Sequence, residues 1–349
     1  LYEGQEFYAC ILDEAQAIKN HTTQKYKAVC KVRSRVRFAL TGTPVENRLG
    51  ELWSIFSFLM PGYLPPYKSF CSRFEKPIVQ EEDQTAVRRL NQLTGPFILR
   101  RMKSDVLKEL PPKTENVYRI ELEEEQRKLY LAAVVDAREK LQAAKPEDKM
   151  AVFAVLMRLR EICCDPRLIA DNWEGGSAKL DACVELVSSA VEGGHRILLF
   201  SQFTSMLELL AKRLDAEGIS HFTLQGSTPK PVRAELVRRF NGGEVSVFLI
   251  SLRAGGTGLN LTAADIVIHY DPWWNVAAQN QATDRAYRIG QQNPVQVYKL
   301  IAQDTIEEKI VELQQAKQSL ADTVTGTADG AILSMRPDEL LQLLEGSEP

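Results

Sequence analysis

The sequence has no apolar run near the ~18–20 residues that cross a bilayer, and its first residues lack the basic, apolar and small-residue order of a signal peptide. Its six cysteines form no Cys-x-x-Cys pair, so we expect reduced thiols in a cytoplasmic protein rather than a metal site. A net charge of −3 does not by itself indicate a nucleic-acid binder. Such a function must depend on local basic patches.

The length of 349 residues is sufficient for two domains, and 44% hydrophobic with 26% charged residues is typical of a globular protein. Strand-like and helix-like segments alternate in the second half, from "RILLF" to "VQVYKLIA". Ser177 is a candidate N-cap, and Gly218 and Gly242–Gly243 close two of the helices. This alternation predicts an α/β fold with a parallel sheet covered by helices on both faces.

Two strand-like runs open the first half, "FYACIL" before Asp13 and "VRFAL" before "TGTP". From Glu51 to about Cys164 the apolar residues follow helical spacing, which indicates a helical insertion or connector. "DNWEGGSAK" is typical of a linker, and "PDELLQLLE" near the end is weakly helical.

Asp13 and Glu14 follow directly on a strand, where ligands of parallel sheets bind. One carboxylate there can hold Mg²⁺ through water, while the second orients or deprotonates an attacking water. The alternative is a pair of capping residues for the helix that begins "EAQAIKN".

Three further motifs bear on phosphate chemistry. Thr41, Gly42 and Thr43 follow the second strand, and could sense a γ-phosphate or simply form a turn before a helix that starts at Pro44. Arg285 and Arg288 in "QATDRAYRIGQ" are expected on one face of a helix, where two guanidiniums suit a transferring phosphoryl group or form a solvated basic face. Gly255, Gly256 and Gly258 permit close approach to a phosphate or a tight turn.

DNA contact is predicted from charge and aromatic residues. Between Lys19 and Arg37 the chain carries seven basic residues and no acid. A second cluster contains Arg88, Arg89, Arg100, Arg101 and Lys103. Such clusters bind phosphates without reading sequence, or are merely solvated. Trp273 and Trp274 follow a strand, and core packing is the alternative to DNA contact for this pair.

The chain contains, in this order, the segments "LDEAQAIKN", "LTGTPVENRLGELWSIFSFL", "LRRMKSDVLKELPPKTE", "RILLFSQFTSML", "LQGST", "LISLRAGGTGLNLTAADIVIHYDPWWN" and "QATDRAYRIGQQNPVQVYKLI". These segments resemble those of Swi/Snf-type ATPases, in the bacterial branch of the superfamily two helicase-like proteins. The resemblance runs from about Cys10 to Ile310. It implies two RecA-like parallel-sheet lobes, the first incomplete, with a helical insertion between them. Residues 1–60 would be the carboxyl-terminal part of lobe one, 61–175 the insertion and connector (partly returning to lobe one), 176–320 lobe two and 321–349 a tail.

The resemblance also implies roles for individual residues. Asp13 would organise Mg²⁺, Glu14 would be the catalytic base, and Gln16 would close the box and contact ATP. Thr41, Gly42 and Thr43 would couple hydrolysis to movement, and Arg285 and Arg288 would act on the shared triphosphate from lobe two. The remaining implied contacts with nucleotide or DNA are Gln281, Gly256, Thr257, Asn260, and one of Trp273 and Trp274.

In relatives this motor moves along double-stranded DNA without fully separating it. We therefore expect an ATP- and Mg-dependent monomer that binds the DNA backbone, with proteins on that DNA as candidate cargo. Gln16 and Tyr287 replace a frequent His, and Val276 stands where Pro is common, which fits the bacterial branch and puts a chromatin substrate in doubt. A strand-separating helicase and a non-catalytic binding remnant are the alternatives.

A phosphate loop, Gly-x-x-x-x-Gly-Lys-Ser/Thr, is missing, since none of the 20 glycines is followed by Lys. Only 12 residues precede Asp13, and the chain starts with Leu1. We expect a truncated fragment that alone binds ATP poorly and hydrolyses it negligibly.

Overall fold

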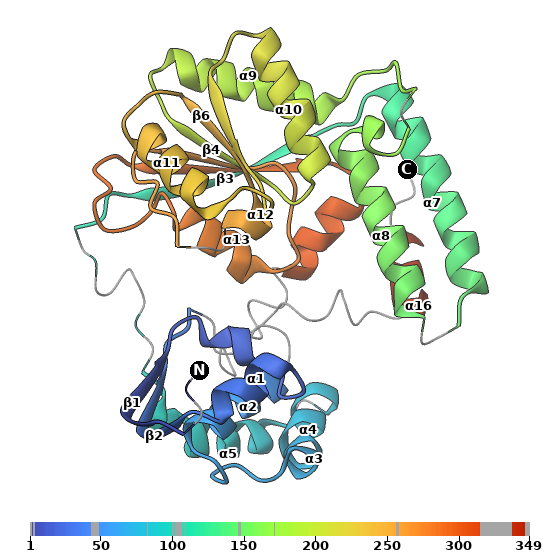
Figure 1. The fold of residues 1–349 in the computed structure, drawn as a ribbon. Coiled ribbons are helices and arrows are strands. Elements are labelled where there is room, and N and C mark those ends of the chain that lie inside the picture. The colour runs from blue at the N-terminus through green and yellow to red at the C-terminus, as the bar shows by residue number, and fades with distance from the viewer. Residues whose placement is uncertain are drawn as a thin grey trace. The chain divides into compact units, whose positions relative to one another are not determined.

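The computed structural model describes residues 2, 4–42, 49–81, 83–99, 101, 107, 109–145, 148–170, 172–255, 258–314 and 337–345. The described residues form two compact units, drawn in Figure 1. Unit 1 holds the described residues up to 101 and Gln314, and unit 2 holds those from 107 to 313 together with 337–345. Each unit is treated by itself below.

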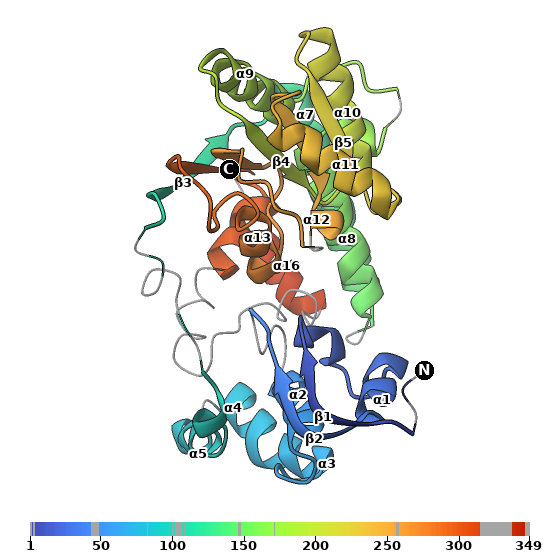
Figure 2. The same ribbon diagram turned by 60° about the vertical axis from the view of Figure 1, so that its left-hand side comes forward.

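Unit 1 contains a pair of parallel strands and a group of short helices. Its strands, β1 (Glu6–Leu12) and β2 (Arg33–Ala39), confirm the two strand predictions, and Leu12 lies opposite Ala39 in the register. Helix α2 packs on β2 (Figure 2). The helical elements in chain order are η1 (Ala15–Ile18), α1 (Gln24–Cys30), α2 (Leu49–Leu59), α3 (Tyr67–Phe70), η2 (Cys71–Glu75), α4 (Lys76–Gln80), α5 (Gln84–Thr94) and η3 (Gly95–Phe97).

Unit 2 is built on a six-stranded sheet in the order β3-β8-β7-β4-β6-β5, with every pairing parallel. The strands are β3 (Lys113–Ile120), β4 (Ile197–Ser201), β5 (His221–Leu224), β6 (Val247–Ser251), β7 (Ile266–His269) and β8 (Val295–Ala302). The helices are α7 (Glu124–Ala143), α8 (Lys149–Cys164), η4 (Pro166–Leu168), α9 (Ala178–Glu192), α10 (Thr204–Ala216), α11 (Lys230–Asn241), α12 (Leu252–Gly255), α13 (Val276–Thr283) and α16 (Pro337–Glu345), and a further helix begins at Ile306. The predicted α/β class with a parallel sheet is confirmed.

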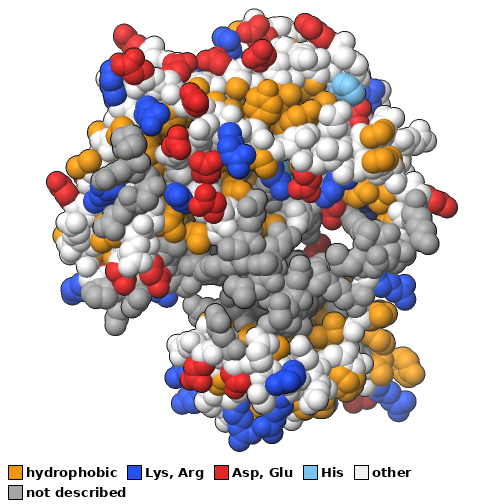
Figure 3. Space-filling model, turned by 180° about the vertical axis from the view of Figure 1, so that it is seen from behind, with side chains coloured by type: hydrophobic (Ala, Val, Ile, Leu, Met, Phe, Trp, Pro, Cys, Tyr) orange, Lys and Arg blue, Asp and Glu red, His pale blue; other side chains and the backbone are white. Residues whose placement is uncertain are grey.

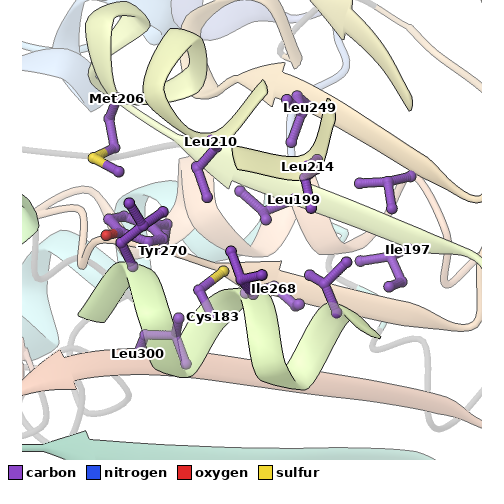
Figure 4. Packing of buried hydrophobic residues seen from close by; sticks show 14 of the residues in the cluster. Cys183, Ile197, Leu199, Met206, Leu210, Leu214, Leu249, Ile268, Tyr270 and Leu300 are labelled. Atoms are coloured by element: carbon purple, nitrogen blue, oxygen red, sulfur yellow. The ribbon is translucent and has the colours of Figure 1, made fainter. Parts of the chain in front are cut away.

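Alternate residues of each central strand enter different cores, because successive strand side chains point to opposite faces. In β4, Leu199 packs with residues of α9 and α10, as Figure 4 shows, whereas Leu198 packs with Phe240 of α11. Helices therefore cover both faces of the sheet.

The predicted helix signals in this unit are confirmed. The Ser177 hydroxyl accepts a hydrogen bond from Leu180 N at 3.4 Å at the start of α9. Gly243 has φ +86° after α11, a conformation that favours glycine.

The region expected as a helical insertion and connector is divided between the units. Helices α3 to α5 belong to unit 1, whereas β3, α7 and α8 belong to unit 2. Strand β3 had no counterpart in the sequence prediction. Helix α16, predicted as weakly helical, packs on α7 and α8, with Leu340 and Leu344 buried. The domain boundaries proposed from the sequence stay predictions.

Candidate active-site residues in the two units

The acid pair lies at the carboxyl end of the strands of unit 1. Asp13 and Glu14 come directly after β1, and both are exposed. Two backbone hydrogen bonds hold this end, from Leu40 N to Leu12 O (2.7 Å) and from Ala15 N to Leu40 O (2.9 Å). Both carboxylates therefore stand at the edge where parallel sheets bind ligands.

The backbone of Glu14 has a left-handed conformation, with φ 51° and ψ 51°. For a residue other than glycine this conformation costs on the order of 1–2 kcal/mol. Glu14 occupies the N-cap position of η1, but its side chain makes no capping hydrogen bond. The helix-capping alternative therefore fits the position of Glu14, while its carboxylate is not used to cap the helix.

Hydrogen bonds join the ends of the two strands of unit 1 through side chains. The Thr41 hydroxyl donates to Gln16 Oε1 at 2.7 Å, and Gln16 Nε2 donates to Glu14 Oε2. The Asp13 carboxylate accepts from Glu14 N at 2.9 Å. The structure thus brings together Asp13, Glu14, Gln16 and Thr41. Gly42 is exposed one residue further on, and Thr43 lies outside the described residues.

In unit 2 the expected helix through the arginine pair is wrong beyond Thr283. Helix α13 ends there, and Arg285 and Arg288 lie in the turns that follow. The carbonyl of Arg285 accepts from Leu261 N at 3.0 Å, and the carbonyl of Ala286 accepts from the Gln291 side chain at 3.1 Å. The backbone of this segment is therefore held by tertiary partners instead of by a continued helix.

The two arginines have different surroundings. Arg285 is 7% exposed, whereas Arg288 is exposed and its Nη1 donates to Leu259 O at 3.5 Å. Both are attached to the 259–264 turn, Arg285 through its backbone and Arg288 through its side chain. We call residues 284–290, which carry both side chains, the arginine turn. Its two guanidiniums are not equivalent, because one is buried and the other is exposed.

Two other predicted residues of unit 2, Gln281 and Asn260, lie close to this turn. Gln281 is half-buried on α13. Asn260 is exposed, and its carbonyl accepts from Asn241 Nδ2 at 2.8 Å. Gly256 and Thr257 lie outside the described residues.

Gln291 is a supporting residue that sequence reasoning missed. It is 7% exposed, and its Nε2 donates to Ala264 O (2.7 Å) as well as to Ala286 O. Its Oε1 accepts from the backbone N atoms of residues 292 and 293, both at 2.9 Å. The amide thereby ties the arginine turn to the 259–264 turn, and no periodicity in the sequence could have indicated this.

His269 supports the same region from the end of β7. Its Nε2 lies 2.9 Å from the Thr283 hydroxyl at the end of α13. Burial, reinforced by the nearby Lys299, lowers the pKa of His269 to about 3. The imidazole is therefore neutral across the physiological pH range.

The two tryptophans differ in how far they are buried. Trp274 is 6% exposed and packs near Phe153 of α8, with ring centroids 6.0 Å apart. Trp273 is half-buried, and its ring lies 5.0 Å from that of Trp274. Core packing accounts for Trp274.

Basic residues line one part of unit 1. Of the seven between Lys19 and Arg37, those exposed are Lys25, Lys27, Lys31, Arg33 and Arg35. Figure 3 shows Lys and Arg side chains gathered on this unit. Arg37 instead donates to Phe58 O at 2.6 Å and supports the fold. In the second cluster Arg88, Arg89 and Arg101 are exposed, and Arg100 and Lys103 lie outside the described residues.

Family models match both units. A model described as an SNF2-related domain matches residues 2–168, and a helicase conserved C-terminal domain matches residues 178–290. A solved SWI2/SNF2 ATPase core domain of Sulfolobus solfataricus is 36% identical with a TM-score of 0.58, covering 96% of this chain and 70% of that chain. The chain belongs to the SNF2-related ATPase family.

Three further proteins are similar to this chain over most of its length. A second Sulfolobus solfataricus ATPase core, solved in complex with double-stranded DNA, is 36% identical with a TM-score of 0.54, and the match covers 89% of this chain and 67% of that one. A Mycoplasma genitalium protein named as an uncharacterized ATP-dependent helicase is 39% identical over 98% of this chain and 33% of its own length. The Bacillus subtilis protein YwqA, whose name describes a helicase/translocase, is 41% identical over 95% of this chain and 37% of its own length. The chain thus spans about a third of the curated relatives that it matches.

Proposed function

We propose that this chain is part of an ATP-driven motor that moves along double-stranded DNA. The observation that carries the proposal is the hydrogen-bonded series Thr41–Gln16–Glu14 at the carboxyl ends of β1 and β2. A change at Thr41 can reach the Glu14 carboxylate through one amide. That is a direct route for linking the state of a nucleotide to the residue that activates water.

Glu14 is proposed as the catalytic base and Asp13 as the magnesium carboxylate. Both are exposed oxygen ligands at a strand end, the type that Mg²⁺ prefers. The described residues contain no group of three or more metal-ligating side chains, which suits an ion held mainly by phosphates and waters. Magnesium would neutralise charge on the β- and γ-phosphates.

Arg285, Arg288 and Gln281 are proposed to stabilise charge on the transferring phosphoryl group. Arginines in this role are worth about 10³–10⁵ in rate. Arg288 is the exposed member, and Arg285 is held by its buried position.

DNA would be bound through its backbone by the exposed basic cluster of unit 1 and by Asn260, Trp273 and the 256–257 segment. The solved relative in complex with double-stranded DNA supports this choice of partner. Candidate cargo is protein bound to that DNA, and the cytoplasm is the proposed location. No helix in the described ranges has the length and apolar character of a membrane span.

The test is DNA-stimulated ATP hydrolysis by the full-length gene product and its Glu14→Gln variant. We expect kcat to fall about 10²–10⁴-fold in the variant with ATP affinity retained, because only the base is lost. An unchanged kcat would remove Glu14 from this role. The 349-residue chain, which contains no Gly-Lys, should show negligible turnover, and robust turnover would contradict this.

Displacement of a third strand from a DNA triplex, compared with separation of a plain duplex, distinguishes translocation from unwinding. Triplex displacement without duplex separation supports the translocase. Duplex separation would favour the strand-separating helicase, and inactivity in every assay would favour a binding remnant.

A further inference from the structure

Arg160 of α8 is a fully buried cation that reaches the carboxyl edge of the sheet in unit 2. Its Nη2 donates to Asp271 Oδ2 at 3.2 Å and to the Pro272 carbonyl. Both Arg160 and Asp271 are 0% exposed. The guanidinium carbon also lies 4.5 Å from the centre of the Trp274 ring. One side chain thus contacts three of the four residues from 271 to 274.

Asp271 extends this contact to a second strand. Its Oδ1 accepts from the Ser201 hydroxyl at 2.6 Å and from Gln202 N at 3.2 Å, at the end of β4. Burial raises the pKa of Asp271, and Arg160 and Ser201 oppose that shift. The carboxylate therefore links the ends of β4 and β7 to α8.

The energetics of the Arg160–Asp271 pair indicate that Arg160 holds its partners in position and adds little stability. Burying an ion pair gains little stability, since an apolar group of similar volume is often as good or better. Arg160 Nε and Nη1 have no hydrogen-bond partner among the described residues, and the guanidinium lies over the rings of Trp274 and Phe203. An apolar side chain could fill this space, but it could not hold the Pro272 carbonyl and the Asp271 carboxylate together.

We propose that Arg160 is a positioning residue for the tryptophan turn, residues 271–275, and that the turn held in this way presents Trp273 to the backbone of double-stranded DNA. The DNA part rests on the proposed function. Trp274 is buried by the contact, whereas Trp273 stays half-buried with its ring 5.0 Å from that of Trp274 at an interplanar angle of 31°. The Trp273 ring packs against the Trp274 ring that Arg160 holds, and also against two hydrophobic clusters of unit 2.

The test is Arg160→Lys in the 349-residue chain, because lysine keeps the charge but lacks the planar guanidinium that lies over the Trp274 ring. The matched control is Arg158→Lys, an exposed arginine on the same helix. Near-ultraviolet circular dichroism reports the paired indoles, and fluorescence anisotropy with a labelled DNA duplex reports binding. We expect Arg160→Lys to weaken the indole signal and to lower duplex affinity about tenfold, and the control to change neither.

Trp273→Phe separates positioning from general loss of stability. It should lower duplex affinity by itself, and adding Arg160→Lys should then lower it little further, because both changes act through one ring. Independent, additive losses would overturn the proposal, as would an unchanged indole signal in Arg160→Lys. If the unaltered chain binds no duplex, the proposed DNA function fails, while the indole signal still decides whether Arg160 positions the turn.

Discussion

Lys179 and Glu307 form a buried ion pair whose removal gives a quantitative test of unit 2. Lys179 Nζ contacts Glu307 Oε2, and both side chains are 0% exposed. The same carboxylate oxygen accepts from Ala302 N at 2.9 Å. Lys179→Met would leave Glu307 buried with this backbone donor as its main partner. Breaking a buried pair in this way costs about 3–5 kcal/mol, a large fraction of the ~5–15 kcal/mol by which a typical domain is stable.

A double-mutant cycle shows how much of this loss is uncompensated charge. Adding Glu307→Gln to Lys179→Met removes the charge but keeps an acceptor for Ala302 N. We expect the double variant to recover roughly 2 kcal/mol or more of the loss, within the usual range for coupled contacts. Urea unfolding at pH 7, followed by tryptophan fluorescence, measures Lys179→Met, Glu307→Gln and the double variant. Lys212→Met, on an exposed lysine of α10, is the control and should cost less than about 0.5 kcal/mol.

The pH dependence gives an independent check. Burial alone would lower the pKa of Lys179, but the contact with Glu307 outweighs it and the pKa is raised. A raised pKa means that the stabilisation is fully present below the unfolded value of about 10.4 and fades above it. The difference between the parent chain and Lys179→Met should be constant from pH 7 to 9 and narrow above pH ~10.5. A single-variant loss below about 1 kcal/mol, or strictly additive effects in the cycle, would refute the reasoning.

Three other substitutions test the site regions. Glu14→Val should be less stable than Glu14→Gly by about 1–3 kcal/mol and unfold at a lower temperature, because a β-branched residue fits the left-handed backbone poorly. Equal melting temperatures would argue against that conformation. Gln291→Ala should cost about 2–4 kcal/mol in urea unfolding through its lost hydrogen bonds, with exposed Gln292→Ala neutral, and a neutral Gln291→Ala would exclude the tie between the turns. The lowered pKa of His269 means that stability falls as pH drops from about 6.5 towards 3. His269→Gln should remove up to ~1.4 kcal/mol per pH unit of that slope, and an unchanged slope would assign the acid sensitivity to other groups.

Local signals in the sequence were enough to predict much of unit 2. From Ser177 to Ala302 the alternation of apolar strands with capped helices is strong, because central strands are buried on both faces and read as continuous apolar runs. The Ser177 cap and the glycines after α10 and α11 are signals of the same local kind. They depend on neighbouring residues and not on distant contacts.

Strand β3 shows why the rest could not be predicted. It is an edge strand, and in "KTENVYRI" only Ile120 is buried. Its polar residues lack the pattern that marks a strand, and pairing with β8 places it in the sheet. Likewise, the arginine turn has a helical sequence, but contacts with Leu261 and Gln291 override that propensity.

In the candidate site too, local sequence signals predicted some features and tertiary contacts determined the others. The position of Asp13 and Glu14 at a strand end could be predicted from the apolar run before them. The left-handed backbone of Glu14 and its link through Gln16 to Thr41 could not, because they depend on how two strands separated by twenty residues end side by side. The sequence therefore predicted which residues stand at the strand end, while tertiary contacts determined their geometry.

The hydrogen bonds of Gln16 give a physical meaning to the presence of Gln instead of His at this position. Many related remodellers have His at this position, and a histidine can both donate and accept only in its neutral form, which is lost as the ring is protonated near pH 6.5. The Gln16 amide always carries a donor and an acceptor, and here it uses both, towards Glu14 and from Thr41. The series from Thr41 to Glu14 therefore has a central member that does not titrate. In this chain, titration of the residue at position 16 therefore adds no pH dependence to the hydrogen-bonded series.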